Sequence, residues 1–295
     1  MPEAKDFYNA VAADYGQQYQ RENLYELPTY PSNYFRLQLL VDSFVRKGVK
    51  RVLEVGVGEG TPLVNVSRLG IDVCGFDISE KMVETAKSQF TENGLDPGRV
   101  IWGDIQDCLT YAHLLKDGEF DGVIAMGVMP HVEKDHLALS NIRTCVKPGG
   151  TVFIEFRNKL FSLFTFNRYT YEFIMDDLLA EVHPDVRKAV SDEIKPRLRM
   201  ELPPQRATTA TGAPGYDAIL SKFHNPLELH TLFRDCGFSN LEFLWYHYHP
   251  AMPMLGNQLG RLFREESVKL EHEPSGWRGM FLCSAFVVQA VRSST

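Results

Sequence analysis

The chain has few of the features that mark secreted, membrane-embedded or nucleic-acid-binding proteins. Its five cysteines are scattered and form no CxxC pair, which favours reduced thiols inside a cell. No apolar run reaches the roughly 18–20 residues of a membrane helix, and the opening MPEAKDFYNA lacks the apolar region of a signal peptide. A net charge of −7 argues against the basic surface that nucleic acid requires. We therefore expect a cytoplasmic protein without membrane or nucleic-acid partners.

The composition is otherwise that of an ordinary globular chain. Hydrophobic residues make up 44% of the 295 positions, enough for a full core. That length fits one large α/β domain, or one domain with an inserted cap. We find no internal repeat, and the only biased stretch is PPQRATTATGAPG, residues 203–215, which is typical of a loop.

The stretch RVLEVGVGEGTP, residues 51–62, organises the rest of the chain. β-Forming residues lead into a segment with glycine at every second position from Gly56, which predicts a buried strand, a tight loop and then a helix. Thr61 is expected to cap that helix and Pro62 to occupy its first position. Backbone amides at the positive end of the helix would suit an anionic group. Both the carboxylate of an amino-acid-like cofactor and a phosphate would fit.

Four further segments predict strands, at residues 71–77, 100–104, 120–132 and 146–156. The first two of these segments end in acidic residues, Asp77 and Asp104. In a doubly wound fold, an acid at the tip of the second strand is placed to accept hydrogen bonds from a ribose diol. Taken alone, either aspartate would more often cap a helix or a turn. The order of the segments therefore favours a nucleotide-like ligand at the strand tips.

Five motifs in this series resemble, in order and spacing, those of the class I S-adenosylmethionine-dependent methyltransferases. They are EVGVGEG, GFDIS, GDIQD, FDGVIAMGVMPHV and VKPGGTVFIE, and the resemblance covers residues 50–156 well and 224–291 loosely. It implies an α/β fold with a doubly wound, seven-stranded, mostly parallel sheet of the Rossmann-like methyltransferase type, whose last strand is reversed. Periodicity agrees with that ending and predicts helices and strands alternately at residues 225–236, 239–249, 256–269 and 281–291.

We expect four regions along the chain: N-terminal lid helices at 1–47, a cofactor-binding core at 48–156, a helical cap at 157–224 and the C-terminal part of the core at 225–295. Aromatic residues at helical spacing near the N-terminus, Tyr15 among them, indicate a helix that either covers the cofactor or packs on the sheet. The cap is too long for a plain connection. By resemblance it would bind the acceptor. The alternative is a dimerisation element, so a homodimer stays open.

The resemblance implies S-adenosyl-L-methionine as cofactor, held across the carboxyl ends of the strands. Asp77 would accept hydrogen bonds from the ribose hydroxyls, and Ile78 would lie against adenine. Asp104 would accept from the adenine amine, beside the Ile105 amide. The full predicted cofactor set is Tyr15, Glu54, Gly56, Gly58, Asp77, Ile78, Asp104, Ile105 and Met126. A nicotinamide dinucleotide is the alternative, but the Gly-x-Gly-x-Gly spacing here differs from its Gly-x-Gly-x-x-Gly fingerprint.

His131 is the predicted general base. It follows the fourth strand, near where the methyl group should point, and an ordinary histidine pKa near ~6.5 suits proton removal at neutral pH. The alternative is a structural histidine that bonds a loop carbonyl. The predicted acceptor is a small metabolite such as a sugar or a natural-product intermediate, methylated on oxygen or nitrogen.

Five other side chains are predicted to contact the acceptor. An arginine just past the fifth strand would suit an acidic acceptor, or it could pair with a surface acid. Two histidines near the C-terminus are two residues apart, so they would share one face of a strand. With a third, remote histidine they give only weak evidence of a metal site, and we expect no metal. The predicted acceptor contacts are Arg157, Tyr169, His224, His247 and His249.

The function best supported by the sequence is a small-molecule O- or N-methyltransferase. An enzyme of the same fold with other chemistry, such as a decarboxylase or cyclase, is an alternative because fold does not determine function. A nicotinamide-dependent oxidoreductase and a silent binding module are further alternatives. The tetrad Met126-Gly-Val-Met129 has no polar side chain to hold a planar amine, which disfavours methylation of nucleic-acid bases.

Overall fold

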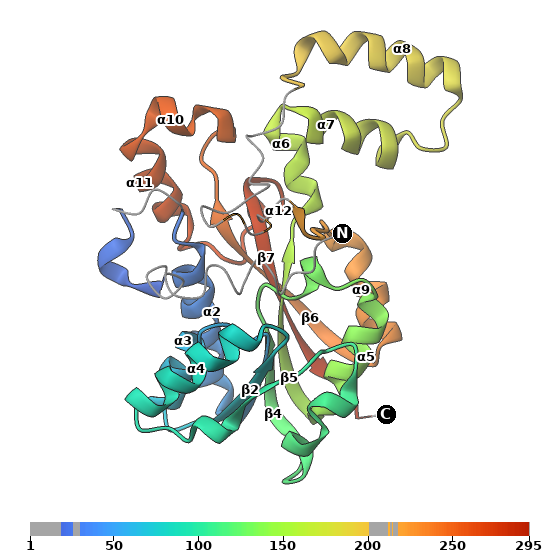
Figure 1. The fold of residues 1–295 in the computed structure, drawn as a ribbon. Helices are drawn as coiled ribbons and strands as arrows, with labels where there is room; N and C mark the ends of the chain where they lie inside the picture. The colour runs from blue at the N-terminus through green and yellow to red at the C-terminus, as the bar shows by residue number, and fades with distance from the viewer. Residues whose placement is uncertain (1–18, 26–29, 201–211, 213, 215–217, 295) are drawn as a thin grey trace.

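The computed structural model describes residues 19–25, 30–200, 212, 214 and 218–294, and contains one seven-stranded sheet (Figure 1). The strands are β1 (Arg51–Val55), β2 (Asp72–Asp77), β3 (Val100–Trp102), β4 (Phe120–Ala125), β5 (Val146–Arg157), β6 (Phe238–Tyr248) and β7 (Cys283–Arg292). Their order across the sheet is β3-β2-β1-β4-β5-β7-β6. β7 runs antiparallel to both of its neighbours, β5 and β6, and the other neighbouring strands pair in parallel. The expected doubly wound sheet with a reversed last strand is confirmed.

Helices cover both faces of the sheet (Figure 1). One face carries α2 (Ser32–Lys47), α3 (Thr61–Ser67) and α4 (Glu80–Glu92), and the other carries α5 (Asp135–Cys145) and α9 (Pro226–Asp235). Each face has its own buried apolar cluster, because alternate residues of a strand point to opposite sides. This three-layer arrangement brings the carboxyl ends of β1, β2 and β4 to one edge of the sheet.

Side chains cap two of the helix starts, and the cap predicted at Thr61 is not formed. Ser79 caps α4 by accepting from the Met82 amide at 3.1 Å, and Asn225 caps α9 in the same way. Thr61 was expected to cap α3, and this is wrong. Gly60 takes the cap position with a φ of 95°, while the Thr61 hydroxyl donates to Glu59 Oε2 at 2.7 Å. Glycine adopts this φ without strain, so the chain turns one residue earlier.

The insertion after β5 projects beyond the carboxyl ends of the strands (Figure 1). It contains α6 (Ser162–Thr165), α7 (Arg168–Glu172), the π-helix η8 (Phe173–Leu178) and α8 (Pro184–Ile194). The described part of the insertion is therefore largely helical, and α6 ends at Phe166, whose φ is 53°. Its last part, residues 218–224, comes back to the end of β5, where Asn158 and His224 form a parallel bridge. That this insertion caps the acceptor stays a prediction.

The C-terminal helices differ in one respect from the sequence prediction. A single helix was expected over residues 256–269, but the chain forms α10 (Gly256–Leu259) and α11 (Arg261–Leu270), separated at Gly260. Gly260 has a φ of 53° and a ψ of −122°, a conformation outside the helical region. A short helix, α12 (Gly279–Leu282), precedes β7. No helix in the described parts of the chain is long and apolar enough to span a bilayer.

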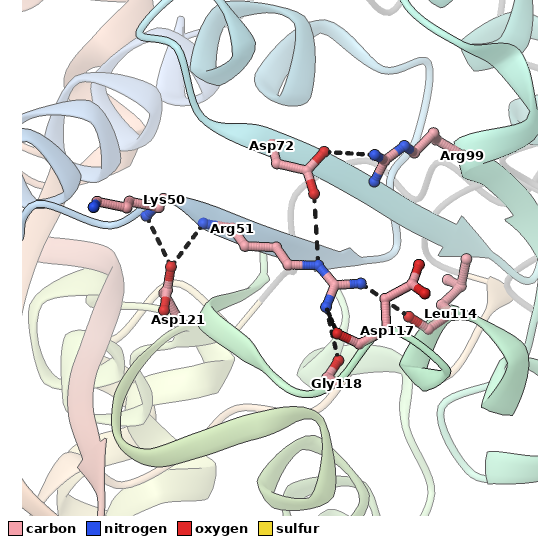
Figure 2. Close-up of polar contacts among 8 residues, drawn as sticks. All are labelled: Lys50, Arg51, Asp72, Arg99, Leu114, Asp117, Gly118 and Asp121. Carbon is pink, nitrogen blue, oxygen red and sulfur yellow. Dashed lines mark hydrogen bonds and ion pairs between the residues drawn. The ribbon is translucent and has the colours of Figure 1, made fainter.

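Arg51 joins the amino ends of two strands to the loop before β4 (Figure 2). Its Nη1 donates to the carbonyls of Asp117 and Gly118, each at 2.9 Å, and its Nε lies 3.5 Å from Asp72 Oδ2. Asp72 also pairs with Arg99 at 2.8 Å, an ion pair whose side chains are about 40% exposed. The guanidinium therefore donates hydrogen bonds to loop carbonyls that take no part in strand pairing.

We expect Arg51→Met to lower the free energy of unfolding by about 1–3 kcal/mol, because it leaves those carbonyls without a charged donor. Arg99→Met is the matched control. It removes only an exposed ion pair with Asp72, and should change the same quantity by less than about 1 kcal/mol. Urea unfolding of both variants measures the difference. Equal effects would show that Arg51 acts only as another surface charge.

Candidate functional site

A cavity opens where β1, β2 and β4 end, at the crevice where the strand order reverses. The described residues that line it are Tyr19, Arg36, residues 54–58, 76–78, Met82, residues 103–106, 126–128, His131 and Val132. Eight of the nine predicted cofactor residues are among them, and so is His131. The ninth, Tyr15, lies outside the described residues. The structure thus brings together residues that the sequence places at four separate strand ends, those of β1, β2, β3 and β4.

The amides of the glycine loop already have acceptors within the protein. Those of Gly56 and Val57 donate to the Phe76 carbonyl at 2.9 and 3.0 Å. The Gly58 amide donates to Asp77 Oδ2 at 2.9 Å, and the Thr61 amide to Glu59 Oε1. The sequence predicted an open ring of donors for an anion, and the structure instead turns these donors toward β2. Glycine is required at Gly56, because a Cβ there would lie 2.5 Å from Val128.

Carboxyl groups give the cavity its electrostatic character. Glu54 is 1% exposed, and its Oε2 has no hydrogen-bond partner among the described residues. Burial raises the pKa of Glu54 well above its ordinary value, although Arg36 acts in the opposite direction. Burial also raises the pKa of Asp77 to about 6, against the hydrogen bonds from the Ser79 and Gly58 amides. A cationic ligand would relieve both carboxyl groups.

Arg36 is a lining residue that the sequence reasoning missed. It lies on α2, its Nη1 pairs with Glu155 Oε2 at 2.7 Å, and its Nη2 donates to the Tyr19 hydroxyl at 3.1 Å. The Arg36 side chain is 9% exposed. A usable signal existed, since Arg36 falls on the same helical face as the buried Leu37 and Leu40. A charge on the apolar face of a helix requires a buried partner.

His131 lies on the cavity wall in η6 (Met129–His131), the turn that follows β4. Its Nδ1 is 2.6 Å from the carbonyl oxygen of Leu220. A carbonyl only accepts, so Nδ1 carries the proton and Nε2 is the basic nitrogen. Burial lowers the pKa of His131 to about 4; Arg157 lowers it further, whereas the Leu220 bond and Glu155 raise it. The ring both lines the cavity and bonds a loop carbonyl.

Three of the predicted acceptor contacts lie around residues 218–224. Arg157 donates to the Ser221 hydroxyl, and its guanidinium stands 5.7 Å from the Phe223 ring. The ring of Tyr169 lies 5.8 Å from Phe223. His224 is buried and its Nε2 is 3.2 Å from Asp135 Oδ2, in a second groove beside α9. None of the three is among the described residues that line the first cavity.

The remaining two predicted contacts lie at the end of β6. The rings of His247 and His249 stack with centroids 5.0 Å apart, and Tyr30 stacks on the other face of the pair at 4.5 Å from His247. His249 Nε2 is 3.3 Å from the Ser284 hydroxyl. Burial lowers the pKa of both histidines. Within the described residues, no group of three or more His, Cys, Asp or Glu side chains is arranged to hold a metal ion.

Known proteins share this fold and sequence pattern. Residues 53–154 match the family described as a methyltransferase domain. The ubiquinone biosynthesis O-methyltransferase of Coxiella burnetii (strain Dugway 5J108-111) is 27% identical over 157 residues, which are 53% of this chain and 64% of that protein. The ubiquinone biosynthesis O-methyltransferase of Caulobacter vibrioides is 30% identical over 126 residues, which are 42% of this chain and 47% of that protein. This chain thus covers less than two thirds of the length of these curated relatives.

Two solved structures support the fold assignment. A SAM-dependent methyltransferase from Thermotoga maritima superimposes with a TM-score of 0.51 and 15% identity, over 97% of this chain and 98% of that one. A chain from the complex of the Haloferax volcanii Trm112 methyltransferase activator with a methyltransferase superimposes with a TM-score of 0.52 and 16% sequence identity, over 99% of both chains. The chain thus carries a methyltransferase domain at residues 53–154, on a fold that it shares with these two structures.

Proposed function

We propose that this chain transfers a methyl group from S-adenosylmethionine to an oxygen or nitrogen atom of a small metabolite. The observation that supports this cofactor best is the buried Oε2 of Glu54, which has no partner within the described residues. It lies in a cavity that Asp77 and Asp104 also line. Besides its carboxylate, the cofactor carries an ammonium, a sulfonium, a ribose diol and an adenine amine. These four groups are cationic or donate hydrogen bonds, so carboxylates complement them.

The same features disfavour a nicotinamide dinucleotide. Its pyrophosphate is anionic and usually binds unpaired amides at a helix start. Here the amides of Gly56, Val57 and Gly58 donate to β2, and α3 is only seven residues long. An anion would also stand close to Glu54 and Asp77, with Arg36 as the nearby cation. The electrostatics of the cavity therefore favour the sulfonium cofactor.

Each lining residue has a defined part in this proposal. Asp77 would hold the ribose diol, and Asp104 would hold the adenine amine beside the Ile105 amide. Ile78 would pack on adenine. Glu54 would receive the ammonium group. The remaining predicted contacts are Gly56 and Gly58 at the methionine part, Met126 at the sulfonium side and Tyr15, which lies outside the described residues.

His131 would act as the general base of the transfer. When bound, the cofactor would supply an electrophilic methyl group to an aligned acceptor atom and leave as the thioether S-adenosylhomocysteine. The ring is neutral at neutral pH, and its Nε2 is the nitrogen that accepts a proton. It would take the proton of an acceptor hydroxyl as the new bond forms. The O-methyltransferase names of the relatives support oxygen as the methylated atom.

The acceptor would enter from the side of the insertion, residues 157–224. Arg157 and Tyr169 stand beside the exposed ring of Phe223, which gives that side one cation and two aromatic rings. A sugar or a natural-product intermediate with an acidic or aromatic group would suit them.

Calorimetry with S-adenosylhomocysteine and with NADH tests the cofactor assignment. We expect heat only with S-adenosylhomocysteine, and heat only with NADH would exclude the proposal.

Cofactor affinity should depend on pH through Asp77. The free protein holds this carboxyl with a pKa of about 6, while the ribose diol requires the ionised form. Binding therefore weakens as pH falls through about 6, by roughly tenfold per pH unit below it. Titrations with S-adenosylhomocysteine between pH 5 and 8, in wild type and Asp77→Asn, measure this. The variant should lose the Asp77 part of the dependence, and an unchanged profile would assign it to another group.

A further inference from the structure

Residues 218–224, here called the return segment, bring the end of the insertion to the cavity wall. The Leu220 carbonyl accepts from His131 Nδ1 at 2.6 Å. The Lys222 amide donates to the Pro130 carbonyl at 2.9 Å, and the His224 amide to the Arg157 carbonyl at 2.8 Å. The return segment is thus tied by its backbone to the turn after β4 and to the end of β5.

Asp135 holds two side chains of the same segment. Its Oδ1 is 2.5 Å from Lys222 Nζ, and its Oδ2 is 3.2 Å from His224 Nε2. Asp135 begins α5, four residues after His131, so one short stretch carries both the ring and the residue that holds the segment. Burial alone would raise the pKa of Asp135, but hydrogen bonds from His224 and Lys222 outweigh it and lower the pKa. The carboxylate is therefore ionised and firmly paired.

The position of the Leu220 carbonyl determines which nitrogen of His131 is basic. With this contact, the proton stays on Nδ1 and Nε2 can accept one. Without it, an imidazole exchanges between two tautomers, and only one of them has a basic Nε2. Hydrogen bonds weaken steeply over a few tenths of an ångström and a few tens of degrees. A small displacement of the return segment would therefore change the chemistry of the ring.

We propose that Asp135 is a positioning residue: through Lys222 and His224 it holds the Leu220 carbonyl against His131 and so determines the tautomer and orientation of that ring. The catalytic meaning of this arrangement rests on the proposed function, in which His131 is the base. The arrangement itself does not, because it concerns contacts within the free protein.

The groups around His131 determine what happens when the segment loosens. Burial is the largest cause of its low pKa, Arg157 lowers that pKa further, and the Leu220 bond and Glu155 raise it. If Asp135 no longer holds the segment, water reaches the ring and the largest of these effects weakens. The pKa of His131 should then rise from about 4 toward its ordinary 6.5, and the ring should populate both tautomers.

Nuclear magnetic resonance of the ring nitrogens tests this in the full chain without cofactor or acceptor. Asp135→Asn and Lys222→Gln are the test variants, and His131→Gln identifies the resonances of the ring. Wild type should show only the Nδ1–H tautomer, with a midpoint near 4. Both test variants should show mixed tautomers and a midpoint raised by about one pH unit or more. Their affinity for S-adenosylhomocysteine should equal that of wild type.

Asp192→Asn is the matched control. It makes the same substitution in α8 of the same insertion and breaks an exposed pair with Lys188 at 2.6 Å. The ring of His131 should not respond. Unchanged tautomers and midpoints in both test variants would overturn the proposal. If Asp135→Asn does not fold, Lys222→Gln decides, since it keeps the contact between Asp135 and His224. Absence of cofactor binding in wild type would instead refute the proposed function.

Discussion

Asp77→Ala is expected to weaken the binding of S-adenosylhomocysteine by roughly 30- to 1,000-fold, or about 2–4 kcal/mol. A hydrogen bond to a charged group contributes about 1.5–3 kcal/mol, and a diol offers two of them. The net gain should lie below the sum of two such bonds, because the carboxylate already accepts from the amides of Gly58 and Ser79, at 2.9 and 2.8 Å. Isothermal titration calorimetry measures the affinity directly.

Asp72→Ala is the control for this substitution. Asp72 begins the strand that Asp77 ends, so the same change is made at the opposite edge of the sheet. Its side chain pairs with Arg51 and Arg99 and is 42% exposed, so its loss should leave cofactor affinity unchanged. If the dissociation constant of Asp77→Ala stayed within about threefold of wild type, a binding free-energy change of less than about 1 kcal/mol, Asp77 would not be a cofactor contact.

The second large effect concerns turnover rather than binding. His131→Ala should reduce kcat by about 10²- to 10⁴-fold while leaving the affinity for S-adenosylhomocysteine unchanged, because the ring is proposed to act only on the acceptor. His136→Ala is the control, since His136 is an exposed histidine five residues along the chain. Rates with an acceptor found by screening measure the difference. Full turnover by the His131 variant would leave the enzyme without its proposed base.

The pH dependence of turnover in the same reaction gives a second test of the role of His131. The neutral ring is the active form, and burial lowers the pKa of His131 to about 4 from the ordinary 6.5. Turnover at saturating cofactor should therefore stay level from neutral pH to about 5 and fall as pH drops through about 4. A fall in turnover centred at pH 6.5 instead would indicate that His131 is exposed to solvent during the reaction.

Local patterns were sufficient to predict where the strands begin and which strand tips carry acidic residues. Strand tips, helix starts and the acids at positions 77 and 104 depend on short stretches of sequence, in which residue type and spacing determine the conformation. The structure places these pieces on one cavity because parallel strands share an edge. Two local predictions failed where glycine competed, at Gly60 before α3 and at Gly260 between α10 and α11. The strand expected over residues 120–132 also ends early, at Ala125, and Met129–His131 forms a helical turn instead.

Contacts between distant residues could not be predicted. The Gly58 amide turns to Asp77, 19 residues away, and His131 meets Leu220 across 89 residues. Arg36 reaches Glu155 across 119. Each of these contacts depends on how whole elements pack, and a single sequence carries no signal for the pairing. The two histidines at the end of β6 show the same limit: their shared face was predicted, but not that it turns toward Tyr30 instead of the cavity.

A crystal structure with S-adenosylhomocysteine would most directly test whether the cavity holds this cofactor. We predict both ribose hydroxyls within hydrogen-bond distance of the Asp77 carboxylate, the ammonium beside Glu54 Oε2, and the sulfur on the side of the cavity that His131 lines. Density for the ligand in another place, or in the cavity with its ribose away from Asp77, would contradict the assignment of this site.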